Sequence, residues 1–214
     1  MATNAAARVT RRQRAELLRD IYVIVNEDAR AIELAQAVLT AGVRILQYRA
    51  KTGLSGDRLR ALRALTRERD ALLIMNDNWR AAVEFDCDGV HLGPDDAGFD
   101  RVASVRAMLP ERLIGLSSGT IAEAKAAGDA DYLGVGSIFA TGSKNDAGEP
   151  IGLDGLQAIA ACTLLPIAAV GGLTAARLPE VRRSGAAMAA VISAVAGAPA
   201  PRSAARELIE AWQQ

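Results

Sequence analysis

The sequence contains few of the residues from which most metal sites and proton-transfer sites are built. It has one histidine, His91, and two cysteines, Cys87 and Cys162, which are far apart and in no CxxC spacing. This pattern provides neither a disulfide framework nor a recognisable cysteine or histidine metal site. We therefore expect two buried, reduced thiols.

Net charge and long apolar runs are also missing. Twenty-five basic and 25 acidic residues cancel, which argues against a protein that coats nucleic acid or an anionic membrane. No apolar run approaches the roughly 18 residues of a membrane span. The arginine-rich beginning lacks the apolar stretch of a signal peptide. We expect a disordered tail over residues 1–9, an extra helix after it, and a location in the cytoplasm.

What the chain does have is a regular alternation of short apolar runs and segments with helical periodicity. Half of its 214 residues are apolar, which allows a sizeable core. Eight runs have the length and composition of strands. They are residues 21–26, 43–49, 71–77, 88–93, 112–118, 131–139, 165–172 and 186–193.

Alternating units of this kind require parallel strands joined by right-handed crossovers, with both faces of the sheet buried. Eight units fit a closed (β/α)8 barrel, the TIM barrel. An open doubly wound sheet is the alternative, but it usually shows GxGxxG after its first strand. Residues 25–30 read VNEDAR, without glycine, and no linker divides the chain. We predict an α/β protein with a single TIM-barrel domain over residues 1–214.

Polar residues gather where seven of the predicted strands end. In a parallel barrel the loops at these carboxyl ends converge over one opening, which makes them the expected place for a site. In chain order the residues at these strand ends, with the glycines and Ile192 included, are Gln47, Arg49 and Lys51; Asn76 and Asp77; Asp95 and Asp96; Ser117 and Ser118; Thr141, Ser143 and Lys144; Gly171 and Gly172; Ile192 and Ser193.

Two acids, Asp77 and Asp96, follow neighbouring predicted strands. Two carboxylates, with substrate phosphate and water, are the usual ligands of Mg²⁺, and no cysteine or histidine cluster favours zinc. The alternative is that both are helix N-caps, the commoner role for a single aspartate between a strand and a helix.

Three cations, Arg49, Lys51 and Lys144, belong to the same predicted rim. Each alone is more often a solvated surface residue. Beside two acids, however, they indicate a metal and a pyrophosphate bound together, because a metal-bound polyphosphate needs both kinds of charge.

Two further loops have the character of a phosphate site. Gly171 and Gly172 follow the seventh predicted strand, and Ile192 and Ser193 end the eighth. Barrels often bind phosphate at these loops through backbone N–H groups, and glycine lets the backbone come close. The alternative is a simple glycine turn.

His91 alternates with Val90 and Leu92 inside a predicted strand and precedes the strand's end. We interpret it as a hydrogen-bonded interior residue, whose loss should reduce mainly stability.

Together these motifs resemble the thiamine-phosphate synthase family, from about Ile21 to the closing helix. The matching stretches are QYRAK (47–51), ND (76–77), DGVHLGPDD (88–96), DYLGVG (131–136), TGSK (141–144), GG (171–172) and VIS (191–193). The resemblance implies a transferase that joins 4-amino-2-methyl-5-hydroxymethylpyrimidine diphosphate to a thiazole ethyl phosphate, with thiamine monophosphate and pyrophosphate as products. Its partners would be these small molecules, and a homodimer is left open.

The resemblance also implies roles for individual residues. Asp77 and Asp96 would bind Mg²⁺. The pyrimidine diphosphate would be bound by Gln47, Tyr48, Arg49, Ala50, Lys51, Asn76, Ser117 and Lys144, of which Arg49, Lys51, Ser117 and Lys144 would be catalytic. The thiazole phosphate would be bound by Thr141, Gly142, Ser143, Gly172, Val191, Ile192 and Ser193.

The chemistry agrees with this assignment. If pyrophosphate leaves first, the pyrimidine methylene becomes a resonance-stabilised cation, which the thiazole nitrogen attacks without a protein base. Such a reaction needs charge neutralisation and positioning rather than histidine.

Four positions depart from the family pattern: Gly119 replaces a common histidine, Ser137 and Ala140 replace prolines, and Ser143 replaces threonine. Ser143 keeps the hydroxyl. A barrel weakened by the changes at Gly119, Ser137 and Ala140 could bind thiamine phosphate without turnover. A thiazole phosphate tautomerase is a further alternative, and the missing histidine argues against it. A sugar-phosphate isomerase of this fold would be expected to have a strand-end glutamate or an acid pair as proton carriers. We expect no glutamate at the strand ends and rank this alternative last.

Overall fold

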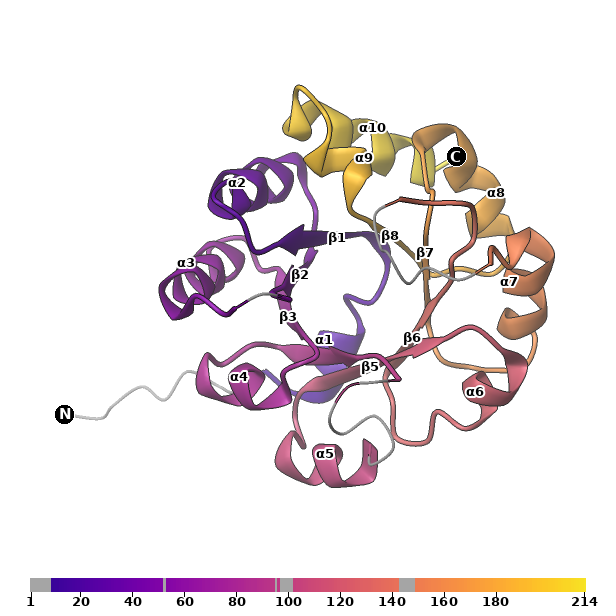
Figure 1. Ribbon diagram of the computed structural model, residues 1–214, viewed down its shortest axis with the longest axis horizontal. Helices are drawn as coiled ribbons and strands as arrows, with labels where there is room; N and C mark the ends of the chain where they lie inside the picture. Colours follow the sequence, from indigo (N-terminus) through magenta and orange to yellow (C-terminus); the bar gives the residue numbers. More distant parts are fainter. Residues whose placement is uncertain (1–8, 52, 95, 97–101, 143–148) are drawn as a thin grey trace.

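The computed structural model describes residues 9–51, 53–94, 96, 102–142 and 149–214. Eight parallel strands form one closed barrel in chain order (Figure 1). They are β1 (Asp20–Asn26), β2 (Ile45–Arg49), β3 (Leu72–Asn76), β4 (Gly89–Leu92), β5 (Leu113–Ser118), β6 (Tyr132–Val135), β7 (Ile167–Val170) and β8 (Met188–Val191). The predicted TIM barrel is confirmed, and each strand except β1, which starts one residue early, lies within its predicted run.

Helices surround the barrel, as Figure 1 shows. They are α2 (Ala31–Ala41), α3 (Gly56–Arg67), α4 (Trp79–Glu84), α5 (Val102–Met108), α6 (Ile121–Lys125), α7 (Gly152–Ala160), η2 (Ala175–Arg177), α8 (Leu178–Arg183), α9 (Ser193–Ala196) and α10 (Pro201–Trp212). The extra helix predicted at the start of the chain is α1 (Arg11–Ala15). Within the described ranges, no helix is long and apolar enough to span a membrane.

The strands bury both of their faces, as their sequences predict. Along β1, Tyr22 and Ile24 belong to the cluster inside the barrel, whereas Val23 and Val25 belong to the larger cluster between barrel and helices. This alternation follows from the two-residue period of a strand. Leu18, just before β1, joins the inner cluster.

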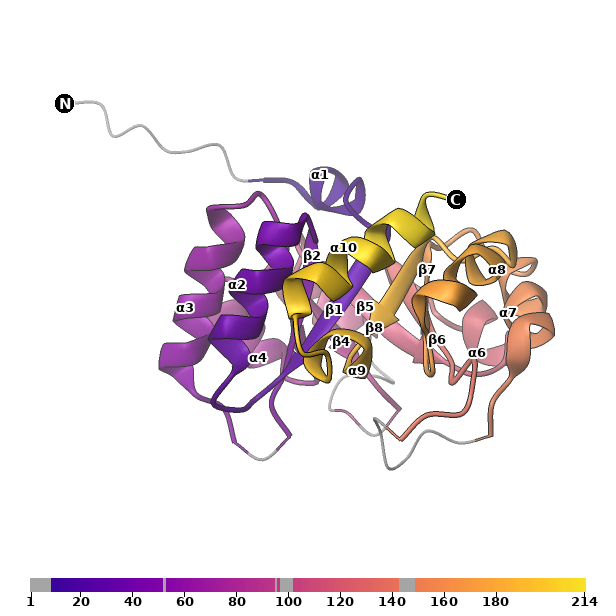
Figure 2. The same ribbon diagram turned by 90° about the horizontal axis from the view of Figure 1, so that it is seen from above.

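Helix α1 lies at one end of the barrel, opposite α9 and the loops that follow the strands (Figure 2). Two arginines attach it there. Arg14 Nε lies 3.0 Å from Asp88 Oδ1 and Arg11 Nε lies 2.5 Å from Asp131 Oδ1. The tail expected over residues 1–9 lies, except for Val9, outside the described residues.

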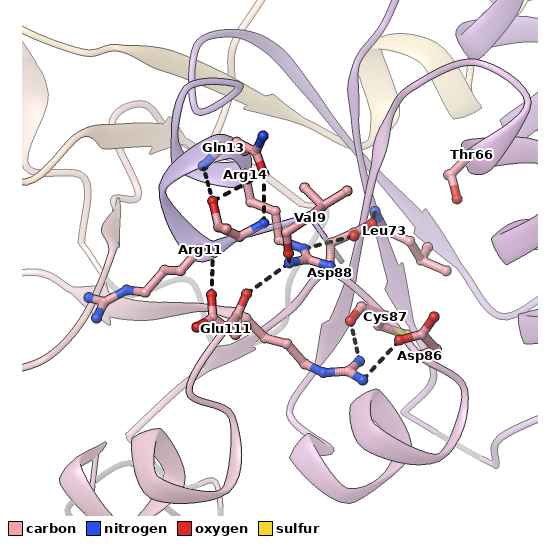
Figure 3. A network of polar contacts seen from close by, with 12 residues as sticks. Val9, Arg11, Gln13, Arg14, Thr66, Leu73, Asp86, Cys87, Asp88 and Glu111 are labelled. Atoms are coloured by element: carbon pink, nitrogen blue, oxygen red, sulfur yellow. Dashed lines mark hydrogen bonds and ion pairs between the residues drawn. The ribbon is translucent and has the colours of Figure 1, made fainter. Parts of the chain in front are cut away.

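Figure 3 shows the surroundings of Asp88. Besides Arg14, it accepts hydrogen bonds from the Leu73 backbone N–H at 2.9 Å and from Arg63 Nη1 at 2.5 Å. Its side chain is 8% exposed. A buried carboxylate is stable only when it is paired in this way, and this one links α1, α3 and the adjacent ends of β3 and β4.

Replacing Asp88 by alanine would leave Arg14 and Arg63 partly buried without a counter-charge. We expect Asp88→Ala to reduce the free energy of unfolding by about 3–5 kcal/mol. Urea denaturation followed by circular dichroism measures the change. Asp57→Ala is the control, because Asp57 is 98% exposed, and it should change stability little. An equally small effect of Asp88→Ala would contradict a structural role for this network.

Candidate active site

A cavity of about 380 Å³ opens at the carboxyl ends of the strands, where the sequence predicts the site. Residues from the ends of seven strands, β2 to β8, line it. Among the predicted site residues, those that line it are Arg49, Lys51, Asn76, Asp77, Asp96, Ser117, Ser118, Thr141, Gly171, Gly172, Val191, Ile192 and Ser193. The strand-end cluster inferred from the sequence therefore converges in space.

Some residues of the predicted pyrimidine site do not line this cavity. Gln47 lies inside the barrel and is 3% exposed. Tyr48 and Ala50 pack in the outer cluster, against the helices. Because alternate residues of a strand face opposite sides, the five residues 47–51 cannot all direct side chains into one cavity. A binding role for Tyr48 or Ala50 stays a prediction that concerns their backbone atoms only.

Other predicted residues lie at or beyond the edge of what the structure describes. Gly142 is exposed and is not part of the cavity wall. Asp95, Ser143 and Lys144 lie outside the described residues, so their roles stay predictions.

Asp77 stands directly after β3 in a conformation that favours glycine, with φ of 65°. Its backbone N–H donates to the His91 carbonyl at 2.8 Å. The helix that follows is capped by Asn78, whose side chain accepts from Ala81 N at 3.0 Å. The N-cap alternative for Asp77 is therefore wrong. Its carboxylate instead contacts Lys51, with Nζ–Oδ2 2.6 Å.

Asp96 meets Asp77. Burial raises the pKa of Asp96 to about 6, and a hydrogen bond with the Asp77 carboxyl group contributes to the rise. The Gly93 N–H, which donates to Asp96 Oδ2 at 2.6 Å, opposes it. Two carboxyl groups so close favour either a shared proton or a cation. The chemistry of this pair fits Mg²⁺.

Within the described ranges, no three His, Cys, Asp or Glu side chains are grouped as metal ligands. An ion held by Asp77 and Asp96 would take its remaining ligands from substrate and water, as Mg²⁺ does in phosphate-binding sites.

The loop after β7 forms another wall of the cavity. Gly171 and Gly172 have φ of 103° and 63°. A Cβ on Gly171 would lie 2.1 Å from Ser137 Oγ, and one on Gly172 would lie 2.7 Å from the Ala140 carbonyl oxygen. Glycine is therefore required at both positions by backbone conformation and by close packing. The alternative of a simple glycine turn accounts for the conformation but not for the close packing. This backbone is available to an anion in the cavity.

His91 is, as predicted, a hydrogen-bonded interior residue. Its Nδ1 lies 3.2 Å from Tyr132 OH and its Nε2 lies 3.2 Å from Ser117 Oγ. It also lines the cavity, which the sequence did not indicate.

Sequence reasoning missed a carboxylate in the cavity wall. Glu123 Oε2 accepts hydrogen bonds from the backbone N–H groups of Gly119 at 2.6 Å and Thr120 at 3.1 Å. The signal was present, since TIAE (120–123) is a capping box, which places the glutamate beside the first residues of its helix. The expectation that no glutamate follows a strand was also wrong, because Glu27 follows β1. Glu27 pairs with Arg58 and does not line the cavity.

The fold and the cavity define a (β/α)8 enzyme with an acid pair and cations at one side of its opening and a glycine loop at the other. The family model of thiamine monophosphate synthase matches residues 21–195. The chain belongs to this family, and the resemblance inferred from its motifs is confirmed. It is a transferase of thiamine biosynthesis, with the thiamine monophosphate-forming activity for which the family is named.

Individual relatives are similar to this chain over most of their lengths. The chain is 45% identical to the thiamine-phosphate synthase of Archaeoglobus fulgidus over 183 residues, 83% of this chain and 85% of the relative. It is 40% identical to that of Moorella thermoacetica, over 89% and 94% of the two chains. The solved thiamine phosphate pyrophosphorylase from Pyrococcus furiosus is 36% identical, with a TM-score of 0.83 over 93% of this chain and 97% of that one.

The raised pKa of Asp96 predicts a pH-dependent change in stability. Its folded value, about 6, exceeds the usual value of about 3.9 for an unfolded chain. The ionised carboxylate therefore destabilises the fold fully above pH 6, and the effect vanishes below about pH 4. In a metal-free buffer, Asp96→Asn should raise the melting temperature at pH 8 and change it little at pH 4.

Thermal unfolding with a chelator present measures this difference, and Asp57→Asn is the exposed control. A variant that is less stable than the unmodified protein at pH 8 would show that the two carboxylates do not repel each other there.

Proposed function

We propose that the cavity binds the pyrimidine diphosphate and the thiazole ethyl phosphate side by side and joins them by loss of pyrophosphate. The observation that carries this proposal is the meeting of Lys51, Asp77 and Asp96 in the cavity that the Gly171–Gly172 loop also lines. Side chains suited to a metal-bound diphosphate thus share the cavity with the Gly171–Gly172 backbone, which is suited to a second phosphate. The family membership supports the same pair of substrates.

The diphosphate belongs at the acid and cation side of the cavity. Lys51 Nζ, held on Asp77 at 2.6 Å, is near enough to the acid pair to contact a diphosphate bound there. Arg49 and Asn76 line the same wall and are suited to donate further hydrogen bonds. Asp77 and Asp96 would hold Mg²⁺, which supplies positive charge for the departing pyrophosphate.

The bond changes need no base from the protein. The electrons of the methylene carbon–oxygen bond leave with pyrophosphate, and the nitrogen lone pair of the thiazole forms the new carbon–nitrogen bond. Lys51 and Arg49 stabilise the charge that develops on the leaving group. The cavity walls keep the two substrates in reach of each other, which replaces a bimolecular encounter.

The thiazole phosphate belongs at the glycine loop. Gly171 and Gly172 give the backbone close access, and Thr141, Ile192 and Ser193 line the cavity beside them. Backbone N–H groups in such loops bind phosphate in many barrels. Lys144 and Ser143 are proposed as further contacts on grounds of the family motif TGSK alone. The enzyme is expected to act in the cytoplasm, and a homodimer is left open.

Two other functions predict different results in one experiment. Folded protein is mixed with both substrates and Mg²⁺, and pyrophosphate release is followed. We expect turnover. Tight calorimetric binding of thiamine phosphate without pyrophosphate release would instead favour a barrel that binds but does not catalyse. Isomerisation of the thiazole phosphate alone would favour a tautomerase, which the glycine at position 119 disfavours.

Loss of Asp77 tests the acid pair directly. Asp77→Ala removes one carboxylate and leaves Lys51 without its partner, so we expect kcat to fall by about 10²- to 10³-fold. A chelator should abolish the activity of the unmodified enzyme, and Mg²⁺ should restore it.

Two control variants accompany this measurement. Asp57→Ala lies on the exposed face of α3 and should retain normal turnover, and His91→Ala should retain far more activity than Asp77→Ala. Activity of Asp77→Ala within about threefold of normal would contradict the proposed metal site.

A further inference from the structure

Below the cavity, five side chains form one continuous hydrogen-bond chain through the barrel interior. Gln47 Nε2 lies 2.7 Å from Tyr22 OH, and Tyr22 OH lies 3.0 Å from Tyr132 OH. His91 Nδ1 is 3.2 Å from Tyr132 OH, and His91 Nε2 is 3.2 Å from Ser117 Oγ. The last two residues line the cavity, whereas Gln47 and both tyrosines are buried beneath it.

The surrounding backbone is shaped to hold the rings of this chain in place. A Cβ on Gly115 would lie 2.1 Å from Tyr132 Cζ, and one on Gly134 would lie 2.7 Å from His91 Cε1. Gly115 lies on β5 and Gly134 on β6. A larger residue at position 115 would displace the Tyr132 ring, and one at position 134 would displace the His91 ring. The rings of His91 and Tyr132 are also in contact, with centroids 5.5 Å apart. The positions of both rings are therefore fixed by packing.

The donor properties of these groups favour one order of donors and acceptors along the hydrogen-bond chain, from Gln47 to Ser117. The Gln47 amide nitrogen can only donate, so Tyr22 accepts from it and has its own proton available for Tyr132. If Tyr22 donates to Tyr132, the proton of Tyr132 is directed to His91 Nδ1.

A neutral imidazole that accepts at Nδ1 carries its proton on Nε2. In that tautomer, His91 would donate to Ser117 Oγ. The Ser117 hydroxyl proton is then available to the cavity.

Burial keeps both phenols protonated, so each has a proton to donate. It raises the pKa of Tyr22 and of Tyr132 well above the ordinary value of a tyrosine. Each tyrosine therefore remains a donor as well as an acceptor over the whole physiological pH range.

We propose that Tyr132, held by Tyr22, is a positioning residue that fixes the Nε2–H tautomer of His91 and so turns the Ser117 hydroxyl into a donor toward the substrate. The inference rests on the proposed function and on the family resemblance, which implies that Ser117 contacts the anionic pyrimidine diphosphate. With the opposite tautomer, Ser117 would donate to His91 Nε2 and present lone pairs to an anion. The direction of these hydrogen bonds thus determines whether the Ser117 hydroxyl presents a proton or lone pairs to the diphosphate.

The tautomer can be measured directly because His91 is the only histidine of the protein. In ¹⁵N-labelled protein, long-range ¹H–¹⁵N spectra show which ring nitrogen carries the proton. We expect Nε2–H in the unmodified protein. The double variant Tyr22→Phe/Tyr132→Phe removes both buried hydroxyls together, so neither phenol is left unpartnered and only the Gln47 amide loses its acceptor. Its spectrum should show a mixture of tautomers.

Tyr48→Phe is the matched control for the spectrum. Tyr48 is fully buried, but it packs in the outer cluster, and its hydroxyl has no hydrogen-bond partner in the part of the chain that the structure describes. Its spectrum should equal that of the unmodified protein. Nδ1–H in the unmodified protein, or an unchanged tautomer in the double variant, would overturn the proposal. This readout does not depend on turnover, so it separates a failure of the inference from a failure of the proposed function.

Kinetics then test whether the tyrosines act through Ser117. We expect the double tyrosine variant and Ser117→Ala each to reduce kcat/KM for the pyrimidine diphosphate by about 10-fold or more, the value of a hydrogen bond to a charged group. Combined with Ser117→Ala, the tyrosine changes should add no further loss, because the same interaction has already been removed. Losses that multiply would show that the tyrosines act independently of Ser117 and would overturn the proposal.

Discussion

Two carboxyl groups that meet at the ends of neighbouring strands are the constraint on which the rest of the site depends. Asp77 and Asp96 are close enough to share a hydrogen bond, and burial raises the pKa of Asp96 to about 6. Without a cation, this arrangement is unfavourable at neutral pH, since two negative charges are held together. The fold maintains it through a left-handed backbone at Asp77 and a turn that brings Asp96 back to the Gly93 N–H. Lys51 neutralises part of the charge.

The barrel explains how so small a region can combine several tasks. Closure brings seven strand ends around one cavity, so residues from distant parts of the chain form the acid pair with its cations and the glycine loop. The opposite end carries the structural interactions, in which Arg11 and Arg14 bind Asp131 and Asp88. Stability and chemistry thus occupy opposite ends, as in other barrels of this class. The site can therefore keep an unfavourable acid pair while the network at α1 supports the fold.

Much of the fold and of the candidate site can be predicted from the sequence. Strands buried on both faces are short apolar runs, and parallel strands direct their carboxyl ends to one side of the sheet. The strands, the acid pair and the glycine loop followed from these rules. The motif QYRAK alone does not show which of its side chains reach the cavity, because strand alternation turns Tyr48 and Ala50 outward. The contact between Tyr22 and Tyr132, 110 residues apart, depends on which interior residues share a layer, and that is set by barrel geometry rather than by local sequence. The place of Glu123 in the cavity wall does not follow from its capping box alone, because the box fixes only where the glutamate lies on its own helix.

The central claim is that Asp77 and Asp96 together hold one divalent cation beside the leaving pyrophosphate. A crystal structure with Mg²⁺ and pyrophosphate tests it most directly. We predict octahedral density between the two carboxylates at the roughly 2.0–2.1 Å ligand distances of magnesium, with a pyrophosphate oxygen among the ligands and Lys51 on the diphosphate. Pyrophosphate bound elsewhere in the barrel, with the two carboxyl groups directed away from each other and no ion between them, would contradict the account.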